Sequence, residues 1–474
     1  MLLFIMDKRF RYKFLGVILL KEKYNLNSYR KQTLKLTIPV FLELLISSLF
    51  GMVDMMMVGN SGPSSITTPS IAAIGITNQM MFIGIAIVQA MSAGGTAMIS
   101  RYCGAEEEER VPNVVKHLVV LMIFLLIIPF VTINELIPEK IMKFIGAEQD
   151  TINIGVNYFK IVILGFIFQS FNLSIFAAIR GTGDTKTPMI INIVVNLLNV
   201  VGNYILIFGK FGMPALRITG AGLSTSLSHI IASIVLFIIL LNKSHVIRLD
   251  ISKGFKFNKP IIENLIRIGG PAALEQVGFR VGVLLFVRIV SGLGTVVYAT
   301  HQIALNILSL SFAPGQSFGI AASTLVGRSL GQEKIHRAEI FIKESNKLAL
   351  ISSIFFGLLF YFFGSTLTAL YTDDSSVIKE SITIMKIVAL IQPFQASAFA
   401  LSGGLRGAGD TVSTLIVTMI GVLIIRLGVA YILINIVGIG LTGAWIAMLL
   451  DQVTRWMGIT IRYRTGKWKT IKLK

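Results

Sequence analysis

The chain has 474 residues, of which 54% are hydrophobic and only 14% are charged, and its formal net charge is +19. Soluble domains carry roughly 25% charged residues, so a chain this apolar has too few polar groups to stay in water, and the composition excludes a soluble protein. The basic residues lie between apolar stretches, so the positive charge indicates membrane orientation and excludes nucleic acid as a partner.

Twelve apolar stretches follow one another along the chain. A membrane-spanning helix needs about 20 mostly apolar residues. Such stretches occur at 38–59, 71–99, 114–134, 155–179, 187–208, 219–241, 264–290, 296–326, 347–370, 381–405, 412–435 and 440–461. We therefore predict an all-α integral membrane protein with twelve transmembrane helices.

The loop charges predict the orientation of these spans. Residues 1–37 hold nine Lys or Arg, and the loop at 242–263 and the C-terminal tail are also basic. By the positive-inside rule we expect both termini to be cytoplasmic, in the plasma (inner) membrane. Residues 2–20 do not form a signal peptide, because charges divide their short apolar pieces, and they could instead form an interfacial helix.

The two halves of the chain resemble each other. Four matches keep their order, with shifts that fall from 232 to 223: Pro39 and Glu43 with Pro271 and Glu275, Arg101 and Gly104 with Arg328 and Gly331, Arg180–Thr185 (RGTGDT) with Arg406–Thr411 (RGAGDT), and Thr219–Ala221 with Thr442–Ala444. Six spans separate equivalent positions, so both halves cross the membrane in the same direction. This is a parallel pseudo-twofold repeat about an axis along the membrane normal.

The repeat predicts two six-helix lobes. The expected segments are a basic cytoplasmic N-terminal segment (1–35), an N-terminal lobe (36–242), a cytoplasmic linker (243–262), a C-terminal lobe (263–462) and a basic tail (463–474). Two such lobes can rock against each other and expose a central cavity to each side in turn. This arrangement predicts a transporter.

Ionisable and amide side chains inside the spans are the candidate functional residues, because such groups are costly in lipid. Glu43 and Asp54 share one face of the first span, roughly 16 Å apart along its axis. Four asparagines spaced 4, 3 and 4 apart share one face of the fifth span, and Thr225 lies in the sixth. The further candidates are Asn192, Asn196, Asn199, Asn203, Glu275, Arg280, His301 and Gln302.

Simpler roles compete with function at each of these positions. Glu43 and Asp54 could serve only in ion pairs or helix caps, and the asparagines only in interhelical hydrogen bonds. Together, a carboxylate, two amide oxygens and a hydroxyl also suit a hard cation or a proton.

Catalysis is not indicated. The five histidines are scattered, and the chain has no HExxH, P-loop or GxSxG motif. Its single cysteine, Cys103, excludes a disulfide framework or a thiolate metal site. We expect no enzyme and no cofactor apart from a coupling ion.

Several motifs resemble the multidrug and toxic compound extrusion (MATE) family. They are Val53–Gly59 (VDMMMVG), the two RGxGDT turns, Pro271–Gln276 and Ala299–Gln302 (ATHQ). The resemblance covers about 36–460. It implies twelve helices in two lobes and export of small amphipathic, often cationic, compounds in exchange for Na⁺ or H⁺.

The resemblance also implies a cation site in the N-terminal lobe. The family's first-span aspartate falls on Asp54 and its paired fifth-span polar positions fall on Asn199 and Asn203. Its sixth-span small residue and threonine fall on Ala221 and Thr225, and the first-span proline linked to helix bending falls on Pro39. Na⁺ could be held at Asp54, Asn199, Asn203 and Thr225.

Two departures from the family pattern limit the site. Some members have an aspartate where Asn203 stands, and other branches use an acidic residue near the positions of Phe279 and Arg280. A second cation site in the C-terminal lobe is therefore not expected. The repeat agrees, because Asp54 maps onto Phe286, Asn199 onto Arg426 and Thr225 onto Met448.

We therefore predict a Na⁺- or H⁺-coupled antiporter that works as a monomer among membrane lipids and exports small amphipathic compounds. A lipid-linked precursor flippase of the wider superfamily is the main alternative, kept open by Arg280, Arg288 and Arg426. A membrane-embedded transferase is a remote one, because its only candidate groups are the Arg and Asp of the RGxGDT turns. We interpret those as stabilising the turns and lobes.

Overall fold

The computed structural model describes residues 26–242, 246–248 and 257–472. Within these ranges all regular secondary structure is helical. The interfacial helix considered for residues 2–20 lies outside them, as do most of the predicted N-terminal segment and much of the linker. The last ten residues of the segment predicted at 1–35 already belong to the first helix.

The N-terminal lobe contains six spans. They are α2 (Leu26–Gly59), α3 (Ser64–Gly104), the interrupted helix α4 (Val111–Met122), η3 (Ile123–Ile127) and α5 (Ile128–Leu136), then α7 (Gln149–Gly181), α8 (Lys186–Phe208) and α9 (Arg217–Leu241). A short 3-10 turn, η2 (Glu108–Arg110), precedes α4, and α6 (Pro138–Ile145) links α5 to α7. One continuous cluster of buried apolar residues packs these helices together.

The C-terminal lobe repeats this plan. Its spans are α10 (Lys259–Ser291), the pair α11 (Thr295–Leu310) and α12 (Phe312–Gly331), α13 (Ile335–Ala369), α14 (Ser375–Gly407), the interrupted helix α15 (Thr411–Met419), η5 (Ile420–Arg426), α16 (Leu427–Tyr431) and η6 (Ile432–Ile436), and α17 (Gly440–Arg464). The short helix η7 (Lys467–Thr470) follows α17. The segments η3, η5 and η6 are π-helical.

The prediction of twelve spans in two lobes is confirmed. Ten helical stretches among the described residues are long and apolar enough to cross a membrane. The other two spans are α10 and α17, with 33 and 25 residues. Both carry several charged residues inside the span, among them Glu275 and Arg280 in α10 and Asp451 and Arg455 in α17.

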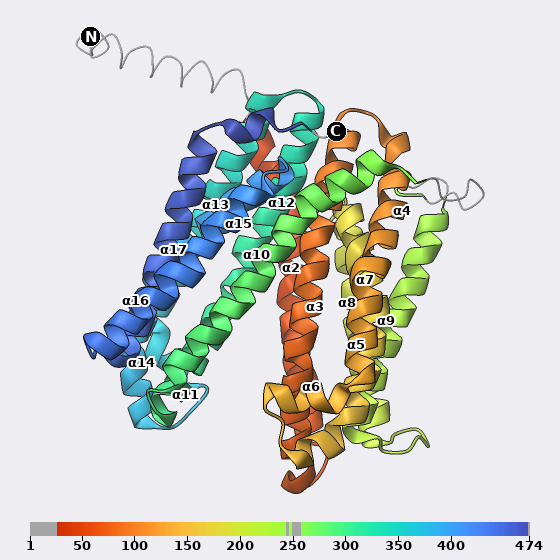
Figure 1. The fold of residues 1–474 in the computed structure, drawn as a ribbon. Coiled ribbons are helices and arrows are strands. Elements are labelled where there is room, and N and C mark those ends of the chain that lie inside the picture. The colour runs from red at the N-terminus through yellow and green to blue at the C-terminus, as the bar shows by residue number, and fades with distance from the viewer. Residues whose placement is uncertain (1–25, 243–245, 249–256, 473–474) are drawn as a thin grey trace.

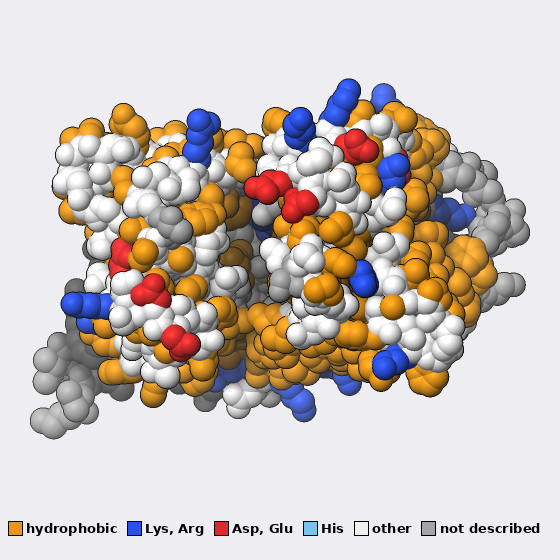
Figure 2. Space-filling view, turned by 90° about the horizontal axis from the view of Figure 1, so that it is seen from below, with side chains coloured by type: hydrophobic (Ala, Val, Ile, Leu, Met, Phe, Trp, Pro, Cys, Tyr) orange, Lys and Arg blue, Asp and Glu red, His pale blue; other side chains and the backbone are white. Residues whose placement is uncertain are grey.

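The two lobes meet at one end of the molecule and separate toward the other (Figure 1). We call the end where α2 begins and α17 ends the closed end. There Arg101 Nη2 donates to Ala408 O at 3.0 Å, Thr324 Oγ1 donates to Arg180 O at 3.1 Å, and Arg30 pairs with Glu344 at 2.7 Å. Figure 2 views the opposite, open end and shows a hollow between the lobes.

The repeated RGxGDT turns lie at the closed end, and their residues have separate tasks. Gly183 and Gly409 have φ angles of 92° and 87°, which favour glycine, so the second glycine of each motif is needed to reverse the chain. Asp184 accepts hydrogen bonds from the backbone of Lys186 and Thr187 and so caps α8. The arginines point elsewhere, toward the buried glutamates described below.

Candidate cation site and buried ion pairs

The predicted cation-site residues lie together in the N-terminal lobe. Asp54, near the open end of α2, accepts a hydrogen bond from Asn203 Nδ2 on α8 at 2.6 Å. Asn199, one turn earlier on α8, lies beside both Asp54 and Thr225 of α9. Thr225 Oγ1 in turn donates to the carbonyl oxygen of Ala221 at 2.9 Å. Three helices therefore place one carboxylate, two amides, a hydroxyl and a carbonyl in one cluster.

The Asn199 amide connects Asp54 to Thr225. Its nitrogen donates to both carboxylate oxygens of Asp54 at 2.8 and 3.0 Å, and its oxygen accepts from Thr225 Oγ1 at 3.0 Å. This orientation gives both atoms of the amide a partner.

The donors in this cluster suit a small monovalent cation. Asn203 is fully buried, and its Oδ1 atom has no hydrogen-bond partner among the described residues. Carboxylate, amide, hydroxyl and carbonyl oxygens are the ligands that hard cations prefer. Asp54 supplies the one carboxylate among the five residues of this cluster, Asp54, Asn199, Asn203, Ala221 and Thr225. Its single negative charge balances one positive charge.

The other half of the asparagine stripe belongs to a different network. Glu43 is 3% exposed and pairs with Arg180 from the RGTGDT turn. Asn192 Nδ2 donates to Glu43 at 3.5 Å, and Asn196 donates to Asn192. The stripe on α8 is thus divided between a structural ion pair toward the closed end and the Asp54 cluster toward the open end.

The same ion pair recurs in the C-terminal lobe. Glu275 is 5% exposed and accepts from Arg406 of the RGAGDT turn at 2.7 Å. Thr414 and Thr418 donate to the same carboxylate at 2.9 and 3.0 Å. Glu43 with Arg180 and Glu275 with Arg406 are therefore repeat-related pairs. Each ties the lobe's first span to the turn before its fifth.

The C-terminal lobe places a fixed guanidinium where the N-terminal lobe has its cluster. Arg426, the equivalent of Asn199, lies over the ring of Phe286, the equivalent of Asp54, with 5.6 Å between guanidinium carbon and ring centroid. Arg426 also pairs with Asp451, which in turn binds Arg455 at 2.9 Å. Asp451 is fully buried. The Arg426 guanidinium therefore occupies the position in the C-terminal lobe that is equivalent to the Asp54 cluster.

The remaining candidates lie apart from the Asp54 cluster. His301 is fully buried between the rings of Phe286 and Trp445, and neither of its ring nitrogens has a hydrogen-bond partner in the described structure. Gln302 donates to the Tyr298 hydroxyl at 2.5 Å. Arg280 on α10 lies over the ring of Phe82 on α3, with 5.5 Å between guanidinium carbon and centroid.

Pro39 lies inside α2, which stays helical on both sides of it.

Sequence reasoning missed Asp451 and Arg455 as a buried pair. Both lie in the last predicted span at i and i+4, a spacing that places them on one helix face. Ionisable residues within a span were the signal that could have found them.

Comparison with known proteins agrees with this architecture. The MatE family model matches residues 39–205 and 271–432. A relative from Thermotoga maritima, "Probable multidrug resistance protein NorM", is 31% identical over 93% of both chains. "Uncharacterized transporter YisQ" of Bacillus subtilis is 26% identical over 91% of this chain and 94% of its own.

Solved structures share the fold. One, described as "Outward-facing conformation of a multidrug resistance MATE family transporter of the MOP superfamily", has a TM-score of 0.84 at 21% identity, covering 94% of this chain and 97% of the other. A second, of a Pyrococcus furiosus transporter of that superfamily, is described as having reversed binding-pocket polarity that suggests a different function. Its TM-score is 0.83 at 22% identity, over 94% and 97% of the two chains. From its family match and its doubled six-helix architecture, the chain belongs to the multidrug and toxic compound extrusion (MATE) family.

Proposed function

We propose that this protein is a cation-coupled antiporter that exports small amphipathic or cationic organic compounds by alternating access. The observation that carries the proposal is the Asp54 cluster, where Asn199 and Asn203 of α8 contact one carboxylate and Thr225 of α9 contacts Asn199. The multidrug-resistance name of the Thermotoga maritima relative supports the substrate class.

In the structure the Asn199 and Asn203 amide nitrogens donate to the Asp54 carboxylate. A bound cation or proton would compete with these donors for the carboxylate oxygens. Loading would therefore change hydrogen bonds among α2, α8 and α9. A substrate needs no contact with the ion, because both can act on one conformational equilibrium.

The orientation in the membrane follows from the same proposal. Both termini would be cytoplasmic, so the closed end would face the cytoplasm and the open end the outside. Substrate release would occur from the conformation described here.

The flippase alternative receives less support from the geometry. Arg426 is buried and paired with Asp451, so it offers no free charge to an anionic lipid headgroup. Arg280 lies over the Phe82 ring, which leaves its charge in place, and Arg288 is exposed, so the alternative rests on these two. In the transferase alternative, the candidate catalytic groups are already engaged in ion pairs. The arginines of the RGxGDT turns are held by Glu43 and Glu275, and Asp410 pairs with Arg462 at 2.6 Å.

Replacing Asp54 tests the proposal. The Asp54→Asn protein in liposomes should lose efflux driven by a Na⁺ gradient or by a pH gradient, each imposed alone, because an amide cannot carry the negative charge that binds the ion. Thermal unfolding in detergent should stay close to that of the unaltered protein, since the residue is only half-buried.

One control variant makes the result specific. Asp373→Asn removes an exposed loop carboxylate and should leave efflux unchanged. Ion-driven efflux at the normal rate by the Asp54→Asn protein would refute the assignment of the site.

A further inference from the structure

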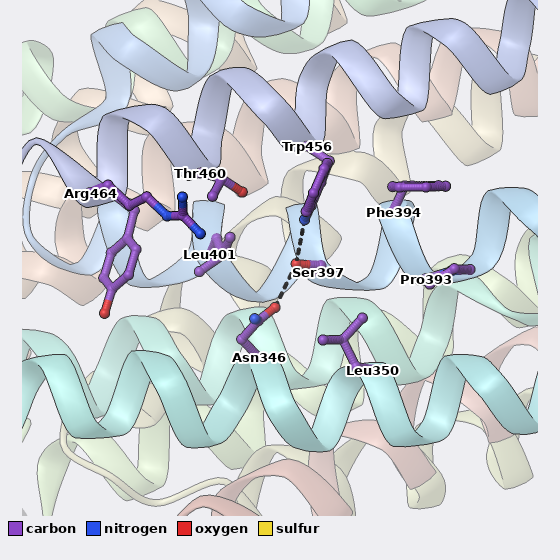
Figure 3. Close-up of a pocket in the computed structure, with 10 residues that line it drawn as sticks. Asn346, Leu350, Pro393, Phe394, Ser397, Leu401, Trp456, Thr460 and Arg464 are labelled. Atoms are coloured by element: carbon purple, nitrogen blue, oxygen red, sulfur yellow. Dashed lines mark hydrogen bonds between the residues drawn. The ribbon is translucent and has the colours of Figure 1, made fainter. Parts of the chain in front are cut away.

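A groove on the outer side of the C-terminal lobe combines apolar walls with several polar side chains. It has a volume of about 320 Å³ and lies between α13, α14 and α17 (Figure 3). Its floor on α14 consists of Pro393, Phe394, Ser397 and Leu401, and its rims carry Asn346 and Leu350 on α13 and Trp456, Thr460, Tyr463 and Arg464 on α17.

The groove faces the lipid. Ile351, next to Leu350 on α13, is 57% exposed, and Ile461, next to Thr460 on α17, is 60% exposed. Exposed apolar side chains on both rims of a membrane-spanning surface contact acyl chains. A hydrocarbon chain can therefore enter the groove directly from the bilayer.

From the closed end toward the membrane interior, the polar groups of the groove follow the order of the phosphate, ester and acyl parts of a glycerophospholipid. Arg464 ends α17 at the closed end, and its side chain extends toward Leu401 and Thr460 (Figure 3). Thr460 lies one turn deeper, about 6 Å along the helix, and its hydroxyl is buried without a hydrogen-bond partner among the described residues. Deeper still, Trp456 donates to Ser397, which donates to Asn346. A phosphate would meet Arg464, ester oxygens would meet Thr460, and the acyl chain would lie along Leu350, Phe394 and Pro393.

The charge at the mouth of the groove favours an anionic headgroup. Arg464, which lines the groove, is exposed and forms no ion pair within the described part of the chain. A cation near a membrane surface attracts anionic lipids, by about 1 kcal/mol for each Lys or Arg.

The internal repeat supplies a matched comparison. The N-terminal lobe has the equivalent groove, of about 370 Å³, between α4, α7 and α9. With the shifts of 227, 226 and 223 found for these spans, Asn346 corresponds to Val119, Ser397 to Phe171, Thr460 to Phe237 and Arg464 to Leu241. The first three of these counterparts line that groove. Asn346, Ser397, Thr460 and Arg464 are thus all replaced by apolar residues in the N-terminal lobe, although Ser174 and Ser233, the counterpart of Trp456, also line its groove. The two grooves therefore differ most at the charged and hydroxyl positions near the closed end.

We infer that the C-terminal groove is a binding site for an anionic glycerophospholipid from the membrane leaflet at the closed end. Arg464 holds the phosphate and Thr460 the ester region. The N-terminal groove holds acyl chains without headgroup selection. This inference concerns lipid recognition and does not rest on the proposed transport function.

Tryptophan quenching in lipid vesicles tests the site directly. Trp445 and Trp468 are fully buried, so the full-length protein reports lipid contact mainly through Trp456. In phosphatidylcholine vesicles, dibrominated phosphatidylglycerol should reach half-maximal quenching at a mole fraction about fivefold lower than dibrominated phosphatidylcholine does. Arg464→Gln should remove this difference. Lys334→Gln, an exposed charge at the same end, should keep it.

A groove-filling variant separates this site from general lipid contact. Thr460→Phe copies the N-terminal lobe's Phe237 and should reduce quenching by both brominated lipids. Equal quenching by the two lipids in the unaltered protein would overturn the inference and show unselective lipid contact only. A preference that survives Arg464→Gln, or quenching unchanged by Thr460→Phe, would overturn it as well. The readout is independent of efflux, so failure here leaves the proposed function untouched.

Discussion

Buried ion pairs hold each lobe together at positions where isolated charges would be costly. The side chains of Glu275 and Arg406 are 7% and 27% exposed, and two threonines complete the shell of the carboxylate. Removing one partner of such a pair leaves the other charge without compensation. Each of these charged residues therefore requires its partner in the folded protein. This holds even if an apolar pair of the same volume would give a protein of equal stability.

Glu275→Gln should destabilise the protein by about 3 kcal/mol, the lower end of the range for a broken buried pair, because Arg406 keeps some contact with solvent. Thermal unfolding of the detergent-solubilised protein measures the effect as a lowered Tm. The double variant Glu275→Gln, Arg406→Gln should recover much of the loss, since no charge is then left unpaired.

The exposed pair between Glu107 and Arg110 provides the control, because its side chains are 43% and 63% exposed. Glu107→Gln should cost at most about 1 kcal/mol. If Glu275→Gln were as mild as Glu107→Gln, the structural role of the repeated pair would be wrong.

At the level of single residues, the sequence identified the polar groups but not their partners. Asp54, Asn199 and Thr225 come from spans whose packing order a single sequence does not state, and only the family resemblance placed them in one site. Glu43 and Arg180 are 137 positions apart, yet both recur in the second half as Glu275 and Arg406. That joint repetition was a usable signal for the ion pair.

At the level of helices, the apolar stretches of the sequence predicted all twelve spans, including the two that carry several charges. The α10 helix contains Glu275, Arg280 and Arg288, and α17 contains Asp451 and Arg455. Glu275 and Asp451 each have an ion-pair partner in their own lobe, whereas Arg280 lies over Phe82 of the other lobe. The π-helical segments were not predictable, because their extra residue per turn depends on how neighbouring helices pack.

Pro39 is the element-scale candidate for a moving part. Proline lacks the N–H that would bond to the carbonyl four residues earlier, so α2 is weakened there although it stays helical. Pro39→Ala restores that donor and should slow efflux from liposomes by stiffening α2. Its Tm in detergent should stay equal or rise slightly, because the substitution adds at most one backbone hydrogen bond.

Pro271, the repeat equivalent in α10, is the matched control for this prediction. The C-terminal lobe has Phe286 and Arg426 in place of an ion cluster, so Pro271→Ala should affect efflux less. Unchanged efflux for Pro39→Ala, or equal slowing by both variants, would contradict a specific hinge in α2.

On the scale of the whole molecule, duplication built a symmetric boundary between two chemically unequal lobes. Gly104 and Gly331 are repeat equivalents, and each lies against the other lobe's backbone. A Cβ atom at Gly104 would lie 2.1 Å from Arg328 O, and one at Gly331 would lie 2.1 Å from Arg101 O. The closed end thus depends on two glycines that allow the helix ends to touch. Separating the lobes there is the change that alternating access requires.

A methyl group at this boundary should therefore favour separation of the closed end. Thr324, 1% exposed and bonded across the boundary to Arg180, is a suitable reporter as Thr324→Cys in a Cys103→Ser background. Adding Gly331→Ala should raise the rate at which a charged maleimide labels this cysteine, because the new Cβ collides with backbone that must move away.

The controls distinguish lobe separation from general loosening. Gly75→Ala adds a methyl group where no atom lies within 4 Å, and should leave the labelling rate unchanged. Ser170→Cys lies fully buried inside the N-terminal lobe, so it should stay protected when the lobes part as rigid bodies. Equal acceleration at Ser170→Cys would mean that Gly331→Ala disrupts packing within the lobes. No acceleration at Thr324→Cys would mean that the glycine contact does not hold the closed end.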